Sequence, residues 1–276
     1  MTVENLILML DNAFDTATIA ASSAAATLPV TNLQEAPRTT VWRSSGTTGT
    51  EYVNITLPAA RGDIEAVAVV DHNLALVSNP ATSTIRVQSW TDSLGGTAPV
   101  IDATYTVWTG FTAPKPAGLI RPVAVVLLPA GAAAKYWRIT LVSETVGLYI
   151  QAGRIYMGPK WQPAINMEWG HTIAMQGRTS FLTSRGGQRW GSPQDPYAEL
   201  SLSLAALTDA EAHELWLQYL RVADHTPFPL CLTPEAGAVS SMPHTLNSFY
   251  CTMGGLDRRD EFVDRQSTSL RLIEDL

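Results

Sequence analysis

Between residues 50 and 157, short segments of alternating apolar and polar residues are separated by turn-forming residues, and no other feature of the sequence constrains the fold as strongly. In "EYVNITLP" every second residue is aliphatic, at Val53, Ile55 and Leu57. Successive side chains of a strand point to opposite faces, so these three residues are predicted to share one face. A series of such segments is typical of an all-β domain.

The remaining segments of this region fit the same pattern. The run "DIEAVAVV" (63–70) is nearly continuous and β-branched, which is typical of a central strand buried on both faces. Further strands are predicted at 83–90, 123–128, 135–142 and 148–158. Roughly eight strands of this length predict a jelly-roll sandwich.

The alternation stops at "MGPKWQPAIN" (157–166), where two prolines and a glycine interrupt it. Domains usually meet in segments of this composition, so a boundary is predicted near residue 162. The chain is then divided into an N-terminal segment (1–26), a jelly-roll domain (27–161) and a second domain (162–276).

Alternation returns in the second domain. The segment "YAELSLSLAAL" (197–207) places Leu200, Leu202 and Leu204 on one face of a strand. The segment 179–191 contains a Gly-Gly pair that predicts a hairpin tip or a bulge. Other strands are predicted at 167–176, 227–235, 246–256 and 266–276.

One helix is predicted at 208–223, because the apolar period changes there from 2 to 3.6 residues. Thr208 and Glu211 have the spacing of a capping box. The residues expected on one apolar stripe of this helix are Leu215, Trp216, Tyr219, Leu220 and Val222. The second domain is therefore predicted to be a β-sandwich with a single helix, and the whole chain to be mainly β.

Composition excludes several classes of protein. The 276 residues carry a formal net charge of −7 and only three lysines, whereas binding to phosphate backbones needs clustered Lys and Arg. Nucleic-acid-specific binding is therefore not expected.

No apolar run has the roughly 18 residues of a membrane span, and the N-terminus lacks the basic start of a secretory signal. Two cysteines, Cys231 and Cys251, are too few for a disulfide framework or a four-thiolate metal site, and buried thiols are expected rather than a bridge.

Sequence signatures of catalytic sites are missing: there is no G-x-S-x-G elbow, Walker loop, H-E-x-x-H or G-x-G-x-x-G after a strand. The five histidines are scattered, and the twelve residues between His213 and His225 are not a ligand spacing on one helix face. No catalytic residue, metal site or cofactor is predicted, and the chain is expected not to be an enzyme.

Two polar segments are candidates for contacts between subunits. "SRGGQRW" (184–190) is predicted to be a hairpin that orders against a neighbouring subunit, or an anion site made by its arginines and glycine amides. "DRRDEFVDR" (257–265) is predicted to be a solvated turn or an intersubunit salt-bridge patch, since a carboxylate pair for acid/base catalysis would need a partner in a cleft. The candidate contact residues are Arg185, Gln188, Arg189, Trp190, Arg258 and Arg259.

A second kind of site is suggested by Trp42 and by "DHN" (71–73). Asp71, His72 and Asn73 follow a predicted strand, and their short polar side chains favour turns and hydrogen-bond sugar hydroxyls. Together with Trp42 and Arg43, which would give an aromatic floor with polar rims, they are candidates for a glycan site. The alternative is that Trp42 anchors the core where the chain enters the jelly roll, while Arg43 lies in the loop before the next strand.

The order of several motifs in residues 27–158 resembles a known family. The motifs are "NLQEAPRTTVWRSSG", "YVNITLP", "IEAVAVVDHNL", "IRVQSW", "KYWRITL" and "LYIQAGRIYMG". They resemble the galactose-binding-like (discoidin-type) jelly roll. Tail proteins of long-tailed bacteriophages contain a variant of this jelly roll with similar "VWRS" and "DHNL" motifs. Residues 163–276 are similar in architecture to the belt or tube-type module of phage distal tail proteins, although in those proteins the ring domain comes first.

The resemblance implies a structural virion protein of the phage tail tip or baseplate, assembled in the host bacterial cytoplasm. Its implied partners are copies of itself in a ring, with a hexamer expected, the tail tube protein, the baseplate hub and tail fibre proteins. The alternative is a carbohydrate-binding module for host surface glycans. A glycan hydrolase or esterase would need placed carboxylates or a nucleophile and base, for which the sequence offers no recognisable setting.

Overall fold

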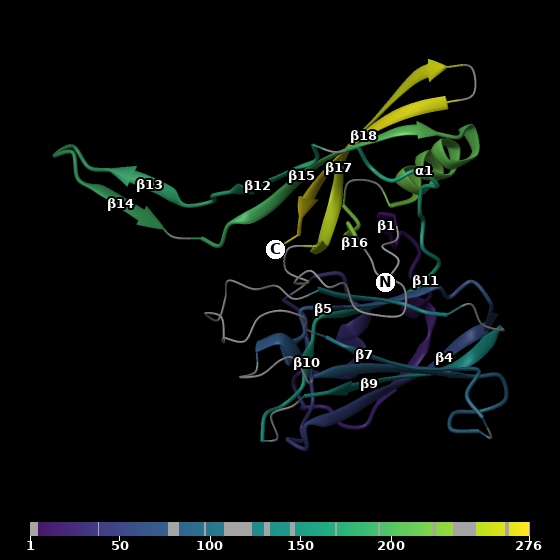
Figure 1. The fold of residues 1–276 in the computed structure, drawn as a ribbon. Helices are drawn as coiled ribbons and strands as arrows, with labels where there is room; N and C mark the ends of the chain where they lie inside the picture. Colours follow the sequence, from purple (N-terminus) through teal and green to yellow (C-terminus); the bar gives the residue numbers. More distant parts are fainter. Residues whose placement is uncertain are drawn as a thin grey trace. The chain divides into compact units, whose positions relative to one another are not determined.

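The computed structural model (Figure 1) divides by its internal contacts into two compact units. It describes residues 5–37, 39–76, 83–96, 98–107, 123–129, 133–143, 147–168, 170–192, 194–222, 225–233, 247–262 and 265–275. Unit 1 consists of Met1–Gln162 and Phe228–Tyr250, and unit 2 of Pro163–Pro227 and Cys251–Leu276. The chain first passes from unit 1 to unit 2 between Gln162 and Pro163, at the boundary that the sequence predicts near residue 162. It returns to unit 1 for residues 228–250, which the sequence analysis assigns to the second domain. The assignment of folding domains stays a prediction.

One layer of unit 1 is a five-stranded antiparallel sheet with the strand order β2-β4-β9-β6-β7. Its strands are β2 (Thr18–Ala21), β4 (Thr50–Arg61), β6 (Thr84–Trp90), β7 (Ile101–Thr106) and β9 (Ala134–Val142). The predicted alternation in β4 is confirmed, because Val53, Ile55 and Leu57 are all buried. Across the sheet, Val53 lies opposite Ile139 of β9, and Ile139 lies opposite Val87 of β6. This row of aliphatic side chains faces the core.

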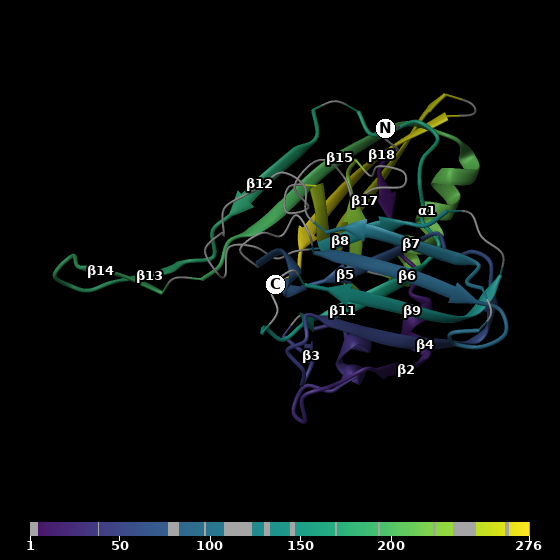
Figure 2. The same ribbon diagram turned by 60° about the horizontal axis from the view of Figure 1, so that its bottom comes forward.

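The second layer is a three-stranded sheet in the order β11-β5-β8. Its strands are β5 (Ala66–Val70), β8 (Val123–Leu127) and β11 (Arg154–Gly158). Every residue of β5 is buried, as predicted for a central strand. Val67 and Val69 belong to the same core cluster as Val53 and Ile55 of the first sheet, and β8 also packs against β16 (Phe228–Cys231). The predicted mainly β class and the two-layered jelly-roll sandwich of the first half are confirmed (Figure 2).

The N-terminal segment contains elements that the sequence pattern does not reveal. The two-residue strand β1 (Ile7–Leu8) pairs with β16, and the 3-10 helix η1 (Ala13–Thr16) is followed by β2. Asn12 caps η1 and also binds β11, donating to the carbonyl oxygen of Ile155 at 3.1 Å and accepting from the N–H of Met157 at 3.0 Å. Strands of two and four residues are too short to show a period of 2.

Unit 2 is built on antiparallel strands in the order β17-β18-β15-β12. These are β12 (Thr172–Gln176), β15 (Tyr197–Leu207), β17 (Ser248–Phe262, in this unit from Cys251) and β18 (Arg265–Glu274). The predicted face of β15 is confirmed, with Leu200, Leu202 and Leu204 buried. The helix α1 (Asp209–Val222) packs on β15 and β18, and β13 (Ser180–Thr183) and β14 (Arg189–Ser192) form a separate hairpin. Among the described strands, the layer opposite the sheet is thus α1 rather than the second sheet of a sandwich.

The predicted capping box at the start of α1 is confirmed. The N–H of Thr208 donates to Glu211 Oε2 at 2.8 Å, and the N–H of Glu211 donates to Thr208 Oγ1 at 3.3 Å. Burial opposes ionisation of Glu211, but the hydrogen bonds from Thr208 and from the N–H of Ala164 lower its pKa overall. The carboxylate therefore stays charged at the positive end of the helix dipole.

The apolar stripe predicted for α1 is wrong in part. Leu215 and Val222 are buried, but the side chains of Trp216 and Leu220 are 38% and 62% exposed. Each helical residue turns by about 100°, so Trp216 and Leu220 lie more than a quarter turn from Leu215. Ala212, three residues before Leu215, completes the inward face.

The charged segment 257–265 is mostly strand rather than turn. β17 continues to Phe262 and β18 starts at Arg265, with Asp257 opposite Ser269. Pairing with β18 keeps this polar segment extended even though its side chains do not alternate. Cys231 and Cys251 are buried, and no disulfide joins them, as predicted.

Candidate functional site

The neighbouring residues Trp42 and Arg43 form the short strand β3 (Trp42–Arg43), which pairs with β10 (Gln151–Ala152). In this extended conformation their two side chains point to opposite faces. Trp42 lies opposite Ala152, and both are fully buried. Arg43 lies opposite Gln151, and both are partly exposed. The alternation of a strand thereby gives the pair two different roles, one in the core and one at the surface.

Trp42 is a core residue. Its side chain is fully buried, and its indole N–H donates to the carbonyl oxygen of Ser23 at 3.1 Å. A ring packed on both faces offers no platform to a sugar, so Trp42 does not form the aromatic floor considered for a glycan site. The alternative interpretation of Trp42 as an anchor of the jelly roll matches its position.

The structure brings only part of "DHN" to the surface. Asp71 adopts a left-handed backbone conformation (φ 53°) in the turn after β5, and His72 is 1% exposed. Asn73, which begins the 3-10 helix η3 (Asn73–Leu76), donates to the carbonyl oxygen of Tyr149 at 2.7 Å. Its own side-chain oxygen accepts from the N–H of Gln151 at 2.9 Å. Asn73 therefore fixes the segment 149–151, and His72 is unavailable to a ligand.

The residue that sequence analysis missed is Tyr149. Its side chain is 39% exposed, and the Arg43 guanidinium lies over its ring at 4.1 Å from the centroid. Gln151 Oε1 accepts from Arg43 Nε at 3.2 Å and from Nη2 at 2.8 Å. A signal for Tyr149 was present in the sequence, because Ile150 and Ala152 are apolar and alternation places residues 149 and 151 outward. We call Arg43, Asn73, Tyr149 and Gln151 the Arg43 cluster.

The Arg43 cluster has the chemistry of an oxygen-binding surface. A guanidinium carries five N–H donors. Gln151 takes two of them, which leaves three N–H groups of Arg43 without a protein partner among the described residues. Stacking on Tyr149 and bonding to Gln151 hold the guanidinium in one orientation, so little side-chain entropy is lost when it binds hydroxyl or carboxylate oxygens.

A second candidate surface lies in unit 2 and is apolar. Nine of the twelve large hydrophobic side chains that are exposed in the described parts of the chain fall between residues 165 and 220. They are Ile165, Ile173, Met175, Phe181, Leu182, Trp190, Trp216, Leu217 and Leu220. Only Val100, Leu148 and Tyr149 belong to unit 1. The nine lie on β12, on the β13–β14 hairpin, on α1 and in the segment before β12, so they form several patches, which together we call the apolar surface of unit 2.

The predicted contact residues 184–190 lie in the β13–β14 hairpin. Its tip closes with a hydrogen bond from Ser184 N–H to the carbonyl oxygen of Gln188 at 2.8 Å, and Gly187 takes a positive φ of 81° there. Arg185, Gln188, Arg189 and Trp190 are all exposed. The predicted hairpin tip at Gly-Gly is confirmed. Of the other two candidates, Arg259 is exposed on β17, and the side chain of Arg258 lies outside the described residues.

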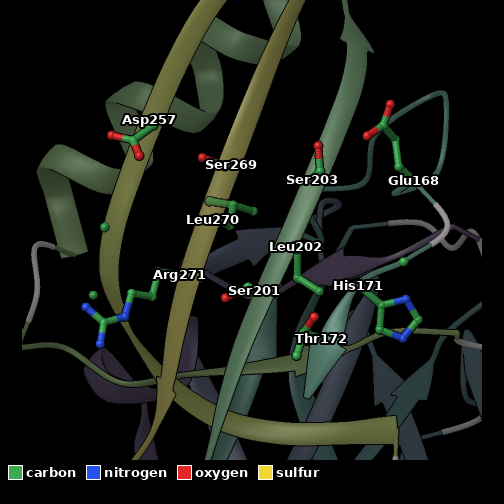
Figure 3. A pocket seen from close by; sticks show the side chains of 13 residues that line it. Glu168, His171, Thr172, Ser201, Leu202, Ser203, Asp257, Ser269, Leu270 and Arg271 are labelled. Carbon is green, nitrogen blue, oxygen red and sulfur yellow. The ribbon is translucent and has the colours of Figure 1, made fainter. Parts of the chain in front are cut away.

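An open pocket of about 540 Å³ lies over the sheet of unit 2 (Figure 3). Ser201, Ser203 and Ser269 supply its floor, and Glu168 and Asp257 lie at opposite sides. β15 and β18 lie between these two acids, which places their backbones three strand spacings apart, about 14 Å.

Within the described residues, no group of three or more His, Cys, Asp or Glu side chains is arranged to hold a metal ion. In the same part of the chain, no helix has the length and apolar character needed to cross a membrane.

Comparison with solved structures gives matches that each cover about half of this chain. No protein-family model matches the sequence, and no curated protein matches it significantly. A chitosan-binding module of a chitosanase/glucanase from Paenibacillus sp. IK-5 is 18% identical, with 53% of this chain and 98% of that chain covered and a TM-score of 0.37. A family 32 module of C. perfringens NanJ, solved with galactose, is 13% identical (55% and 98% covered, TM-score 0.38). A third module, CBM32-3 of a family 31 glycoside hydrolase from Clostridium perfringens, is 15% identical (53% and 93% covered, TM-score 0.41).

Proposed function

We propose that this chain is a non-enzymatic structural subunit that assembles with copies of itself through unit 2. The observation that carries the proposal is the apolar surface of unit 2. In its finer form, the proposal is that the assembly is a ring in the tail tip of a long-tailed bacteriophage, as the sequence resemblance implies. Such a ring would join the tail tube to the hub and the receptor-binding parts.

The hydrophobic effect favours burial of these exposed side chains against a second protein chain. Monomeric proteins rarely expose clustered large apolar side chains, and such clusters mark interaction sites. Leu182 and Trp190 are 76% and 64% exposed on a two-stranded hairpin, and an isolated hairpin is at best marginally stable in water. At the end of the described strand order, β12 presents Ile173 and Met175 on the same face as buried Leu200. A second copy would cover these side chains and give the edge strand a neighbour.

Sedimentation velocity of the purified chain over a range of concentrations tests self-assembly. We expect a discrete species several times the 29.8 kDa of one chain, populated increasingly as the concentration rises. Assembly driven by apolar contacts should persist in high salt, because screening weakens only the charged contacts. A single species at the monomer mass across the whole range would exclude the proposal.

A second candidate function is carbohydrate binding by unit 1, and the Arg43 cluster is the observation that favours it. Tyr149 supplies a half-exposed ring, and Arg43 supplies three N–H donors beside it. An aromatic ring with adjacent fixed donors suits a sugar, which has an apolar face and a hydroxyl rim. Assembly and glycan binding would use different units of the chain, so the two functions are compatible.

If the chain binds a glycan through this cluster, Tyr149→Ala should weaken the binding at least tenfold, because both the ring and the support of Arg43 are lost. A glycan array of the full chain, followed by titration calorimetry with the best-binding glycan, measures the effect. Val100→Ser is the control, since Val100 is a 40% exposed side chain of unit 1 outside the cluster. Binding that is equal in wild type and Tyr149→Ala, or no binding to any glycan, would argue against this function.

A further inference from the structure

Two parts of unit 2 carry exposed apolar residues, and the charged residues of one part are opposite in sign to most of those of the other. One is the β13–β14 hairpin, in which Leu182 and Trp190 are directly opposite each other in the strand register. They therefore lie on the same face of the hairpin and form one apolar contact surface. Residues 177–192 contain three arginines, at 178, 185 and 189, and no acidic residue.

The other part is the outer face of α1. Leu217 and Leu220 are 51% and 62% exposed, and Trp216 beside them contacts Tyr219 at 6.3 Å between ring centroids. The outer face of a surface helix is normally polar, so these residues are unusual. Glu214 is exposed one turn before Leu217, and α1 contains three acidic residues and one basic residue, Arg221.

The two parts lie at opposite ends of β15. The hairpin precedes the start of β15 at Tyr197, and α1 begins just after its end at Leu207. The 11 residues of this strand span about 35 Å at roughly 3.3 Å per residue. Both views show the hairpin extending away from the end of unit 2 that carries α1 (Figures 1 and 2). A chain therefore cannot place its hairpin on its own helix, but a second copy can.

We propose that the hairpin of one copy binds α1 of the next copy. This inference rests on the self-assembly proposed above and names the two surfaces that carry it. Leu182 and Trp190 of one chain pack on Leu217 and Leu220 of its neighbour, and Arg185 at the hairpin tip faces Glu214. The two surfaces differ, so each copy has two binding surfaces: its hairpin, which we call the donor surface, and its α1, which we call the acceptor surface. Contacts of this head-to-tail type close into a ring or continue as a filament.

Two variants separate this arrangement from any symmetric one. Leu182→Ser with Trp190→Ser removes the donor surface, and Leu217→Ser with Leu220→Ser removes the acceptor surface. All four side chains are more than half exposed, so both variants should fold, which circular dichroism and thermal melts would verify. Each variant alone is expected to associate at least a hundredfold more weakly than wild type. Mixed together they should form a one-to-one dimer, because one intact donor meets one intact acceptor.

Charge reversal gives an independent measurement. Arg185→Glu alone should weaken association about tenfold and slow its rate, and Glu214→Arg in the same chain should restore much of the loss. Val100→Ser, which alters an exposed apolar residue outside unit 2, is the control and should associate as wild type does. All of these measurements use sedimentation velocity of the full chain.

The outcomes distinguish this inference from the proposal on which it rests. If wild type assembles but each double variant still assembles alone, or if the mixture of both stays monomeric, hairpin-to-helix binding is wrong while self-assembly stands. If wild type itself stays monomeric at every concentration, both the self-assembly and the hairpin-to-helix binding are wrong.

Discussion

Replacing Trp42 with alanine is expected to lower the free energy of unfolding by roughly 3 to 5 kcal/mol. The indole is fully buried among the side chains of the jelly-roll core, so its loss removes apolar burial and leaves a cavity. The substitution also leaves the carbonyl oxygen of Ser23 without the indole N–H donor. Urea unfolding followed by circular dichroism, compared with wild type, measures the loss.

Arg43→Ala is the matched control for Trp42→Ala. The two residues are neighbours in β3 but lie on opposite faces, and Arg43 is partly exposed. Its replacement should cost about 1 kcal/mol or less. A Trp42→Ala variant as stable as wild type would show that the indole is not part of the core and would restore it as a candidate sugar platform.

Replacing Arg154 with alanine should destabilise the protein by about 3 kcal/mol, the second largest effect expected. Its side chain is 5% exposed and makes three contacts inside unit 1. Nη2 bonds Asp15 Oδ2 at 2.8 Å, Nη1 donates to the carbonyl oxygen of Gln34 at 2.7 Å, and the guanidinium lies 5.0 Å from the ring centroid of Tyr156. Removing the buried guanidinium takes a hydrogen-bond donor from the carbonyl oxygen of Gln34 and from Asp15, which is itself 38% exposed, and it removes the contact with Tyr156.

The effect of Arg154→Ala should also depend on pH. Burial raises the pKa of Asp15 above its usual range, while the Arg154 charge lowers it in part. The ion pair exists only while Asp15 is ionised, so it is lost as the pH falls through that raised pKa. The stability difference between wild type and Arg154→Ala should therefore be larger at pH 7 than at pH 3, as measured by urea unfolding at both values.

Arg86→Ala provides the comparison for a pair of the same chemistry at the surface. Arg86 Nη2 lies 2.6 Å from Asp102 Oδ2, but the two side chains are 45% and 34% exposed. Solvent screens this pair, so its loss should cost about 1 kcal/mol or less. Equal losses for Arg86→Ala and Arg154→Ala would contradict the assignment of the larger effect to burial.

The parts of the fold that could be predicted from sequence are those in which one local pattern decides the structure. Period 2 in β4 and β15, the continuous apolar run of β5 and the capping box of α1 each act within a dozen residues. The short strand β1 could not be predicted, because two residues carry no period and its partner β16 is more than 200 residues away. The exposure of Trp216 and Leu220 is also hidden, since apolar residues on an outer helix face look like core residues in sequence.

The candidate sites were harder to predict, because they depend on contacts between residues that are far apart in the sequence. Arg43 and Gln151 are 108 residues apart, and only the pairing of β3 with β10 brings them together. Trp42 and His72 resemble ligand-binding residues in sequence, yet both are buried. In contrast, the exposed residues of the β13–β14 hairpin were found from sequence, because Gly-Gly between two apolar segments is a local signal for a hairpin.

A cryo-electron microscopy map of the purified full chain tests self-assembly through unit 2 most directly. We expect an annulus or a filament in which each hairpin lies against a neighbouring copy and the side chains of Leu182 and Trp190 are covered. A map of a solitary protomer that leaves both side chains in solvent would contradict it, as would an assembly held together by unit 1 alone.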